Sequence, residues 1–216
     1  MSSILYLIKN IYFQKKILWK ICVPFYYLYV SLRRIQNILL SLGFSFIVAS
    51  KNLVRLKIPC YAIGIKYVTI GENFKAGPGF RIECFDYYLG EKYTPSVKIG
   101  NNVCINYNCH IGAVNSITIG DNVLIGSNVL ITDHSHGSTV YQDLCLAPAS
   151  RHLYSKGEII IEDNVWIGEG VCILPGVVIG HNSVIGANAV VTHDIPAFSV
   201  AIGNPCRTLK RGGECL

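Results

Sequence analysis

The sequence predicts an all-β solenoid in which short parallel strands stack into triangular coils. The first observation is a six-residue period of aliphatic residues, which runs without a slip through Ile161, Ile167, Ile173, Ile179, Ile185 and Val191. The same period occurs earlier, at Ile99, Ile105 and Ile111 and then, after a two-residue slip, at Ile119, Ile125 and Ile131. A period of six is neither helical nor a plain alternation. It suits a coil of three hexapeptides, in which the same corner points inward every time.

The second observation is the choice of residues within each hexapeptide. Stacked strands lie roughly 4.8 Å apart, so the inward aliphatic residues form a ladder that branched Val and Ile side chains fill well. The corners read Ile-Gly-Asn-Asn, Ile-Gly-Asp-Asn and Ile-Gly-His-Asn. Gly and Asn accept the positive φ angles and the small side-chain space of a tight corner. We therefore expect coils over residues 58–205, followed by a tail at 206–216.

The third observation is an N-terminal segment, residues 1–57, that differs from the repeats in charge and composition. It contains nine Lys or Arg and no Asp or Glu, so the net charge of +6 is the sum of +9 here and −3 in the remainder. Its apolar and aromatic runs predict helical structure. The uncharged stretches, 21–32 and 35–50, are shorter than the about 20 apolar residues that a spanning helix needs.

Two interpretations of this segment are open. Lys and Arg residues beside Trp19 and many Tyr favour a helix that lies on an anionic membrane surface. The alternative is a helical cap over the open end of the coils. Lysines that interrupt the early apolar residues argue against a signal peptide, and the lack of a polar face argues against binding to nucleic acid.

The nine cysteines are scattered and odd in number, and none forms a Cys-x-x-Cys pair. This pattern argues against a disulfide scaffold and against a zinc site. It indicates reduced thiols and a cytosolic protein.

A long excursion, residues 132–158, interrupts the period and opens with Thr-Asp-His-Ser-His-Gly. Such a loop needs no ladder residue, so its polar tip can reach over a neighbouring surface to meet a substrate. His134 stands at the root of the loop, where the regular coil holds it rigidly, as a catalytic base requires. His136 and His152 are the more mobile candidates, and Asp133 either orients the loop or caps its turn.

Four segments carry a resemblance to a known family: Asn-Val-Leu-Ile-Gly-Ser-Asn-Val-Leu-Ile-Thr-Asp-His-Ser-His-Gly, Leu-Tyr-Ser-Lys-Gly, Asp-Asn-Val-Trp-Ile-Gly and Asp-Ile-Pro-Ala-Phe-Ser-Val-Ala-Ile-Gly-Asn-Pro-Cys-Arg. With them, residues 106–210 resemble the hexapeptide-repeat sugar O-acetyltransferases. The resemblance is to galactoside and maltose acetyltransferases, and more closely to those that acetylate O-antigen or capsular polysaccharide. It implies a left-handed parallel β-helix, a homotrimer with active sites between subunits, and acetyl-CoA as cosubstrate.

The resemblance also implies roles for acceptor-site residues. His134 matches the histidine that takes a proton from the acceptor hydroxyl, which then attacks the thioester directly; imidazole accepts and returns a proton near neutral pH. Asn106 matches a position that binds the acceptor sugar, where an amide both donates and accepts hydrogen bonds. His136 and Arg151 are expected to contact the acceptor. Val114 stands where galactoside acetyltransferases have an acidic residue, so the acceptor contacts must differ.

For the cofactor, the resemblance implies a groove between adjacent subunits along which CoA lies. The matching positions are Trp166, Glu169, Ala187, Thr192, Arg207 and Lys210. Arg207 and Lys210 follow the last coil, where cations suit the CoA phosphates. His193 replaces a lysine of the family. Glu169 replaces a small residue near the thioester, although its backbone N–H can still stabilise an oxyanion.

Rival functions differ in what they require. A gamma-class carbonic anhydrase needs three converging histidines, and His110, His134 and His136 lack that family's spacing, so no metal is expected. The intact His134 loop argues against a non-enzymatic scaffold, whereas a sugar N-acetyltransferase would use the same base and stays open. We expect an acetyl-CoA-dependent O-acetyltransferase acting on a sugar of a surface polysaccharide or its lipid-linked precursor. It is expected to be cytoplasmic, peripheral to the inner face of a bacterial plasma membrane.

Overall fold

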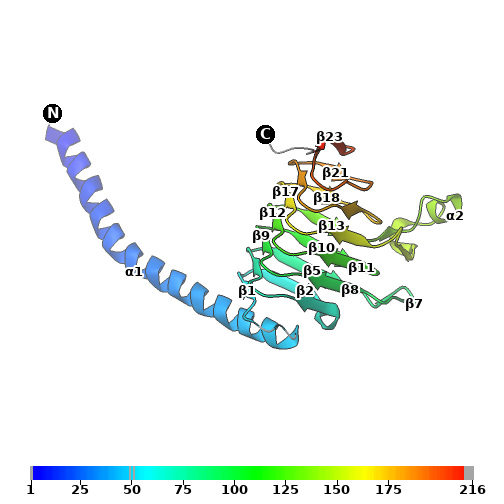
Figure 1. The fold of residues 1–216 in the computed structure, drawn as a ribbon. Helices are drawn as coiled ribbons and strands as arrows, with labels where there is room; N and C mark the ends of the chain where they lie inside the picture. The colour runs from blue at the N-terminus through cyan, green and yellow to red at the C-terminus, as the bar shows by residue number, and fades with distance from the viewer. Residues whose placement is uncertain (1, 49, 51, 212–216) are drawn as a thin grey trace.

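The fold combines one long helix with a stack of parallel coils (Figure 1). The computed structural model describes residues 2–48, 50 and 52–211. Successive coils contribute strands to three sheets, here called face one, face two and face three. All strand pairs within faces two and three are parallel, as predicted for a solenoid.

Face one has the strand order β1 (Arg55–Leu56), β4 (Lys75–Ala76), β9 (Cys104–Ile105), β12 (Leu124–Ile125), β17 (Trp166–Ile167), β20 (Val184–Ile185), β22 (Ser199–Ile202) and β23 (Arg207–Arg211), of which only β23 is antiparallel to its neighbour. Face two has the order β2 (Cys60–Ile63), β5 (Phe80–Cys84), β10 (His110–Ala113), β13 (Leu130–Thr132), β18 (Cys172–Ile173) and β21 (Val190–Val191). Face three has the order β3 (Val68–Ile70), β8 (Ser96–Ile99), β11 (Ser116–Ile119), β16 (Ile159–Ile161) and β19 (Val178–Ile179).

The predicted aliphatic ladder forms the core. On face one, Ile105, Ile125, Ile167 and Ile185 lie in register on successive strands, and each is at most 2% exposed. Like residues stacked at the same inward position exclude water along the whole interior, which is the main stabilising term of such a solenoid.

Asparagines form a second ladder at one corner of the coils. Asn102, Asn122 and Asn164 all have φ close to +58°, in the left-handed region. The Asn102 side-chain amide donates to Asn122 Oδ1 at 2.9 Å, and Asn122 donates to Asn164 Oδ1 at 3.2 Å. Asn therefore serves the corners in two ways: it tolerates the backbone conformation and its amide joins neighbouring coils.

Helix α1 (Ser2–Ile47) caps the first coil with its C-terminal end. Phe44 and Val48 are buried against the core. Ser41 Oγ accepts the N–H of Leu56 at 3.0 Å, and Asn37 Oδ1 accepts the N–H of Ile58 at 2.9 Å. These contacts cover the open end of the solenoid, as the capping interpretation requires. The first strand, β1, lies within residues 1–57, and the division of the chain at residue 57 stays a prediction.

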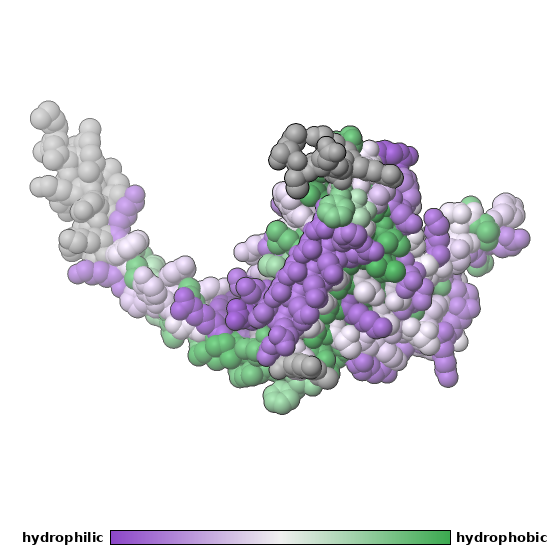
Figure 2. Space-filling model, in the orientation of Figure 1, coloured by the Kyte–Doolittle hydropathy of each residue, from purple (hydrophilic) through white to green (hydrophobic). Residues whose placement is uncertain are grey.

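The remainder of α1 extends away from the coils (Figure 1) and exposes apolar and aromatic side chains, including Trp19, Phe25, Tyr26, Tyr27 and Leu28. Hydrophobic surface also gathers along the outer side of its C-terminal part (Figure 2). Among the described residues, no helix is both long enough and apolar enough to cross a membrane. Attachment to a membrane surface stays a prediction.

Two excursions leave the coils on the side opposite to α1 (Figure 1). The shorter is a hairpin of β6 (Tyr87–Tyr88) and β7 (Glu91–Lys92). The longer is the expected loop, in which β14 (Ser135–His136) pairs with β15 (Leu153–Tyr154), with α2 (Tyr141–Leu144) between them. The longer loop begins directly after β13, which places its first histidine at the edge of face two.

Candidate active site

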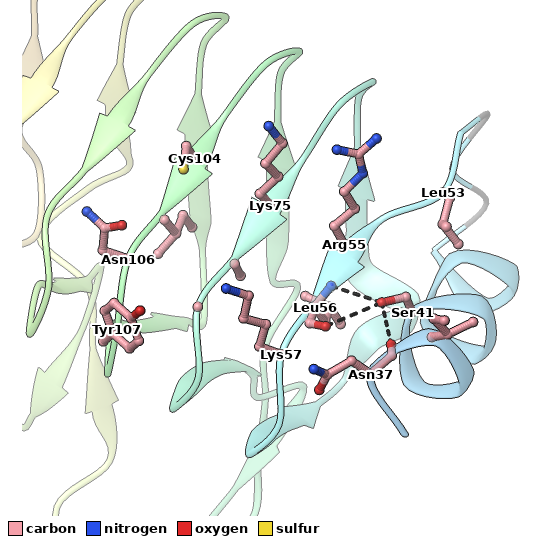
Figure 3. Close-up of a pocket in the computed structure, with 14 residues that line it drawn as sticks. Asn37, Ser41, Leu53, Arg55, Leu56, Lys57, Lys75, Cys104, Asn106 and Tyr107 are labelled. Carbon is pink, nitrogen blue, oxygen red and sulfur yellow. Dashed lines mark hydrogen bonds between the residues drawn. The ribbon is translucent and has the colours of Figure 1, made fainter. Parts of the chain in front are cut away.

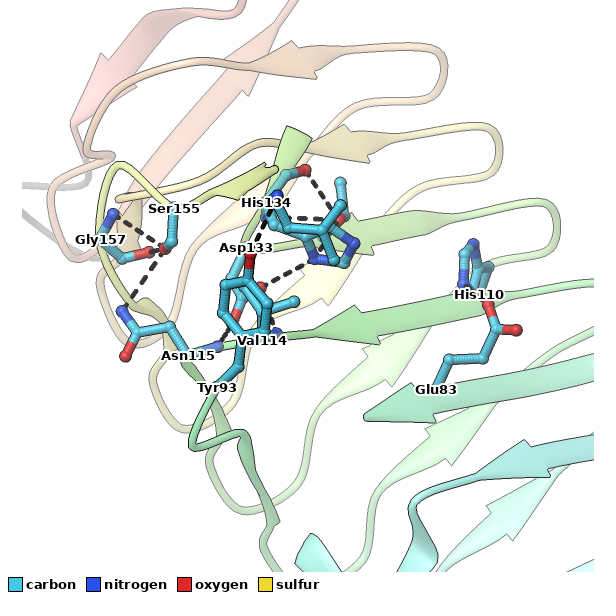
Figure 4. Close-up of polar contacts among 11 residues, drawn as sticks. Glu83, Tyr93, His110, Val114, Asn115, Asp133, His134, Ser155 and Gly157 are labelled. Atoms are coloured by element: carbon cyan, nitrogen blue, oxygen red, sulfur yellow. Dashed lines mark hydrogen bonds and ion pairs between the residues drawn. The ribbon is translucent and has the colours of Figure 1, made fainter. Parts of the chain in front are cut away.

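His134 lies at the corner where the chain leaves face two (Figure 4). Its Nδ1 is 3.0 Å from Oδ1 of Asp133, and Thr132 Oγ1 lies 3.3 Å from the same nitrogen. The Phe85 ring meets the imidazole edge-on, with 6.0 Å between ring centres. These contacts fix the ring and leave Nε2 without a hydrogen-bond partner among the described residues.

Asp133 is fully buried behind His134. Its Oδ1 accepts the N–H of Val114 at 2.9 Å, and its Oδ2 accepts the N–H of Asn115 at 2.8 Å. An ionised carboxylate only accepts hydrogen bonds, so Nδ1 of His134 carries the proton and Nε2 is the acceptor of the neutral ring. Asp133 therefore holds the start of the loop to the coil below and also orients the imidazole of His134, a contact that the sequence reasoning did not identify.

A second polar cluster lies beside His134 on the outer side of face two (Figure 4). Glu83 Oε2 accepts a hydrogen bond from Arg81 Nε at 2.7 Å and lies 2.9 Å from His110 Nε2. Burial lowers the pKa of His110, and the Arg81 guanidinium lowers it further. Gly112 separates the two histidines, because a Cβ there would lie 3.3 Å from His134 Cε1 and 3.4 Å from His110 Nε2. A side chain at this position would therefore press against both imidazoles.

The loop after His134 holds two further residues expected at the acceptor site. His136 is exposed, with Nδ1 3.5 Å from Tyr88 Oη. Arg151 donates from Nε and from one terminal nitrogen to the carbonyl of Leu146, at 3.0 and 2.9 Å. Arg151 thus closes the loop on itself. Contacts of Arg151 and His136 with an acceptor stay predictions.

Four of the other expected residues border one groove at the corner between faces one and two. The groove has a volume of about 360 Å³ and is lined by Asn106, Trp166, Glu169 and Ala187. Asn106 is half-buried and Trp166 is 54% exposed. The structure therefore brings together one expected acceptor residue and three expected cofactor residues.

Glycines keep this groove open. Gly126, Gly168 and Gly186 stand above Asn106 on successive coils, and the N–H of each donates to a carbonyl of the next coil. A Cβ at Gly168 would lie only 2.6 Å from the backbone nitrogen of Ala187. Because side chains are excluded from this column, an extended ligand can lie along the coils with access to the backbone.

The upper end of the coils holds the remaining cofactor candidates. Thr192 Oγ1 lies 2.7 Å from Nδ1 of His193, and Arg207 donates to Nε2 of the same ring. Arg207 also donates to the carbonyl of Cys206 at 2.8 Å. Thr192, His193 and Arg207 thus form one polar chain. The side chain of Lys210 lies outside the described residues.

Asn106 and His134 lie at opposite edges of face two. Asn106 comes just before β10, whereas His134 comes just after β13, the next strand of the same face. Strands that rise about 3.3 Å per residue separate such positions by on the order of 20 Å. The groove and the histidine corner of one chain are therefore two separate parts.

Two residues near His134 were not identified as site residues from the sequence. His110 was considered only as a metal ligand, and Glu83 was not singled out. Their signal is the outward alternation on β5 and β10, where Arg81 pairs in register with His110 and Glu83 with Gly112. Among the residues that the structure describes, no three His, Cys, Asp or Glu side chains are grouped to hold a metal ion.

Comparison with known proteins identifies the family. Residues 158–193 match the family described as bacterial transferase hexapeptide (six repeats). A putative lipopolysaccharide biosynthesis O-acetyltransferase of Escherichia coli, WbbJ, is 35% identical over 184 residues, which are 83% of this chain and 87% of that protein. The Escherichia coli galactoside O-acetyltransferase is 40% identical over 67% of this chain and 64% of its own length.

Solved structures agree with this relation. A galactoside acetyltransferase in complex with coenzyme A aligns with a TM-score of 0.52 and 32% identity over 78% of this chain and 67% of that one. A hexapeptide-repeat acetyltransferase from Vibrio cholerae aligns with a TM-score of 0.52 and 30% identity over 74% and 70%. The chain therefore belongs to the hexapeptide-repeat acetyltransferases, and its coils form the left-handed parallel β-helix of that family.

Proposed function

We propose that this protein transfers the acetyl group of acetyl-CoA to a hydroxyl of a sugar in a surface polysaccharide or its lipid-linked precursor. The observation that carries the proposal is the Asp133–His134 pair, which presents an unpartnered Nε2 at the edge of face two. The names of the relatives, a lipopolysaccharide O-acetyltransferase and galactoside O-acetyltransferases, support the acceptor class.

In this proposal His134 is the general base. Its Nε2 accepts the proton of the acceptor hydroxyl while that oxygen forms a bond to the thioester carbonyl carbon. The ring then carries positive charge, which the buried carboxylate of Asp133, 3.0 Å from Nδ1, stabilises. As the carbon–sulfur bond breaks, His134 returns the proton to the sulfur of CoA. The backbone N–H of Glu169 is proposed to stabilise charge on the carbonyl oxygen.

The donor is proposed to lie along the glycine-lined groove. Trp166 and Ala187 border it, and Arg207 at the upper end of the coils supplies positive charge for phosphate. The residues fit an extended thiol ester with a phosphorylated end, because the middle of the groove lacks side chains and its upper end is polar.

Two copies are proposed to complete each site. Asn106 and His134 lie at opposite edges of face two within one chain, so we infer that a homotrimer brings His134 of one subunit to the groove of the next. Acceptor and donor then meet between subunits.

The first test uses single histidine variants. His134→Ala should lower kcat by about 10²–10⁴-fold, the usual contribution of a positioned base, and leave the affinity for acetyl-CoA nearly unchanged. His136→Ala and His152→Ala are the matched controls and should change mainly the acceptor KM. Full turnover by His134→Ala would refute the assignment of the base. Mass spectrometry of the product then shows whether oxygen or nitrogen carries the acetyl group.

The second test uses mixed subunits. His134→Ala and Asn106→Ala should each be nearly inactive alone, whereas trimers co-expressed from both should recover about one quarter of the activity, because random mixing pairs the intact halves at that frequency. No recovery in isolated mixed trimers would show that both residues act within one chain.

Residues 1–57 are proposed to hold the enzyme peripherally at the cytoplasmic face of the bacterial plasma membrane. Exposed aromatic residues of α1 and its lysines and arginines support this location. Co-sedimentation should show binding to vesicles with anionic lipid that high salt partly releases, since each cation near the surface contributes about 1 kcal/mol. Equal, salt-insensitive binding to neutral vesicles would contradict the electrostatic part.

A further inference from the structure

A second groove continues below the first, between α1 and the lowest strands of face one (Figure 3). Its volume is about 460 Å³. Asn106 lines both grooves, so the two meet at this residue at the corner of the coils. Nothing in the proposed transfer reaction uses the lower part.

Three cations of the lower coils line this groove: Arg55, Lys57 and Lys75. Arg55 and Lys75 are partners in register on β1 and β4, and Figure 3 shows their side chains projecting side by side. Lys57 is two residues beyond Arg55, so it points outward as well, at the start of the column that continues through Gly77 to Asn106. Strand spacings of about 4.8 Å and a rise of about 3.3 Å per residue put the three within reach of one small anion.

The charge of this cluster is not balanced locally. The groove lining contains no Asp or Glu. None of the ion pairs among the described side chains includes Arg55, Lys57 or Lys75. Three exposed, unpaired cations around a concave surface attract a multiply charged anion, and phosphate groups accept the charge-assisted hydrogen bonds that Lys and Arg donate.

The other residues of the groove indicate which groups the rest of the ligand contains. One end is Asn106, the expected contact of the acceptor sugar. The other side is apolar, formed by Ile38 of α1 and by Leu53. Helix α1 also exposes Leu39 and Leu42, and Figure 2 shows hydrophobic surface along the C-terminal part of this helix. A sugar, an anion and an apolar chain in this order fit a sugar attached through phosphate to a larger group.

We propose that the lower groove binds the diphosphate of a sugar-diphosphate acceptor, with the sugar at Asn106. This inference rests on the proposed function, whose acceptor it specifies. The same chemistry occurs in a lipid-diphosphate sugar and in a nucleoside-diphosphate sugar, and the apolar wall of α1 favours the lipid. The phosphate contacts position the acceptor and take no part in the acetyl transfer.

Calorimetry on the full-length protein tests the anion site separately from catalysis. Saturating CoA is present throughout, so that the first groove, lined by Trp166 and Ala187, is occupied. The probes are inorganic pyrophosphate, farnesyl diphosphate, uridine diphosphate and farnesol. The variants are Arg55→Gln, Lys57→Gln, Lys75→Gln and the triple variant, with Lys98→Gln, an exposed lysine of face three, as the control of equal charge change.

Pyrophosphate should bind to the parent protein and to Lys98→Gln with equal affinity. Each single groove variant should bind about 10-fold more weakly, and the triple variant at least about 100-fold more weakly. Tighter binding of farnesyl diphosphate than of uridine diphosphate identifies the lipid source, and the reverse order identifies the nucleotide source. Failure of pyrophosphate to bind, or equal binding by the triple and Lys98 variants, overturns the site. Acetyl transfer to an uncharged sugar is measured in parallel, and its absence in the parent protein contradicts the proposed function whatever the anion does.

Discussion

Replacing Asp133 with Asn tests the pairing that makes His134 a base. The substitution keeps the shape of the side chain and removes one of its two acceptor oxygens. In the structure, Oδ1 accepts from Val114 N–H and faces His134 Nδ1, while Oδ2 accepts from Asn115 N–H. An amide cannot serve all three donors, because its NH₂ group must replace one oxygen.

Both orientations of the amide are harmful. With the NH₂ group toward Asn115, the part-buried backbone N–H of Asn115 loses its acceptor. With the NH₂ group toward His134, the N–H of Val114 loses its acceptor, and the ring must accept at Nδ1, which moves its proton to Nε2 and removes the base. A buried donor without a partner costs about 1–3 kcal/mol, so Asp133→Asn should lower the free energy of unfolding by about that amount.

The kinetic effect should be larger than the stability effect. We expect kcat to fall by about 10²–10⁴-fold, because one orientation removes the base and the other removes the negative charge that stabilises the imidazolium, with the KM for acetyl-CoA nearly unchanged. The assay measures thiol release at a temperature where urea titration shows the variant folded. Asp163→Asn is the control, because Asp163 Oδ1 accepts a backbone N–H at 2.7 Å in a corner remote from His134, a bond that an amide oxygen can keep. A folded Asp133→Asn protein with kcat within about threefold of the parent would refute the reasoning.

Three further outcomes are expected. Phe44→Ala should destabilise the protein by about 3 kcal/mol, because Phe44 is 5% exposed under the cap. Phe46→Ala, at a position that is 85% exposed, should change the free energy of unfolding by less than about 0.5 kcal/mol. Equal effects of the two variants in urea titrations would contradict the capping role of α1. Arg207→Ala should weaken acetyl-CoA binding about 10-fold in calorimetry, and unchanged affinity would move the phosphate site elsewhere. The pKa of His110 is lowered in the folded protein, so the unfolded chain binds the proton more readily. Acidification below about pH 6.5 should therefore reduce Tm, and His110→Gln should make Tm depend less steeply on pH. An identical dependence of Tm on pH in both proteins would show that His110 does not contribute.

Local sequence patterns predicted the solenoid fold and the position of His134 at the root of the loop. The inward-facing aliphatic residues recur every six positions, so each of them can be identified in the sequence. The structure confirms this ladder at Ile105, Ile125 and Ile167. His134 follows the end of β13 by two residues within one continuous motif, so its place at the root of the loop could also be predicted from the sequence. The resemblance gave Asn106 a role at the acceptor and Trp166 a role at the cofactor, and both roles stay predictions. Only the structure showed that the two residues line one groove.

Contacts between coils could not be predicted from these local sequence patterns. Corresponding corner asparagines of neighbouring coils are 20, 29 or 42 residues apart, because the β6–β7 hairpin lengthens one interval and the long loop lengthens another. The partner of Asp133 in the coil below, Val114, and the approach of Glu83 to His110 depend on these unequal lengths. The contacts of the Asp133 and Glu83 carboxylates could therefore be identified only once the register of the coils was known.

The sequence by itself determined the repeat, the core and the residue chemistry of the loop, because each depends on spacings shorter than one coil. The tertiary structure decided which polar groups meet, because hydrogen bonds such as that from Leu56 to Ser41 depend on where α1 docks. It also showed that α1 and the first two strands of face one enclose a cationic groove continuous with Asn106. Arg55, Lys57 and Lys75 appear in the sequence only as scattered charges, and the docking of a helix against stacked strands makes them one site.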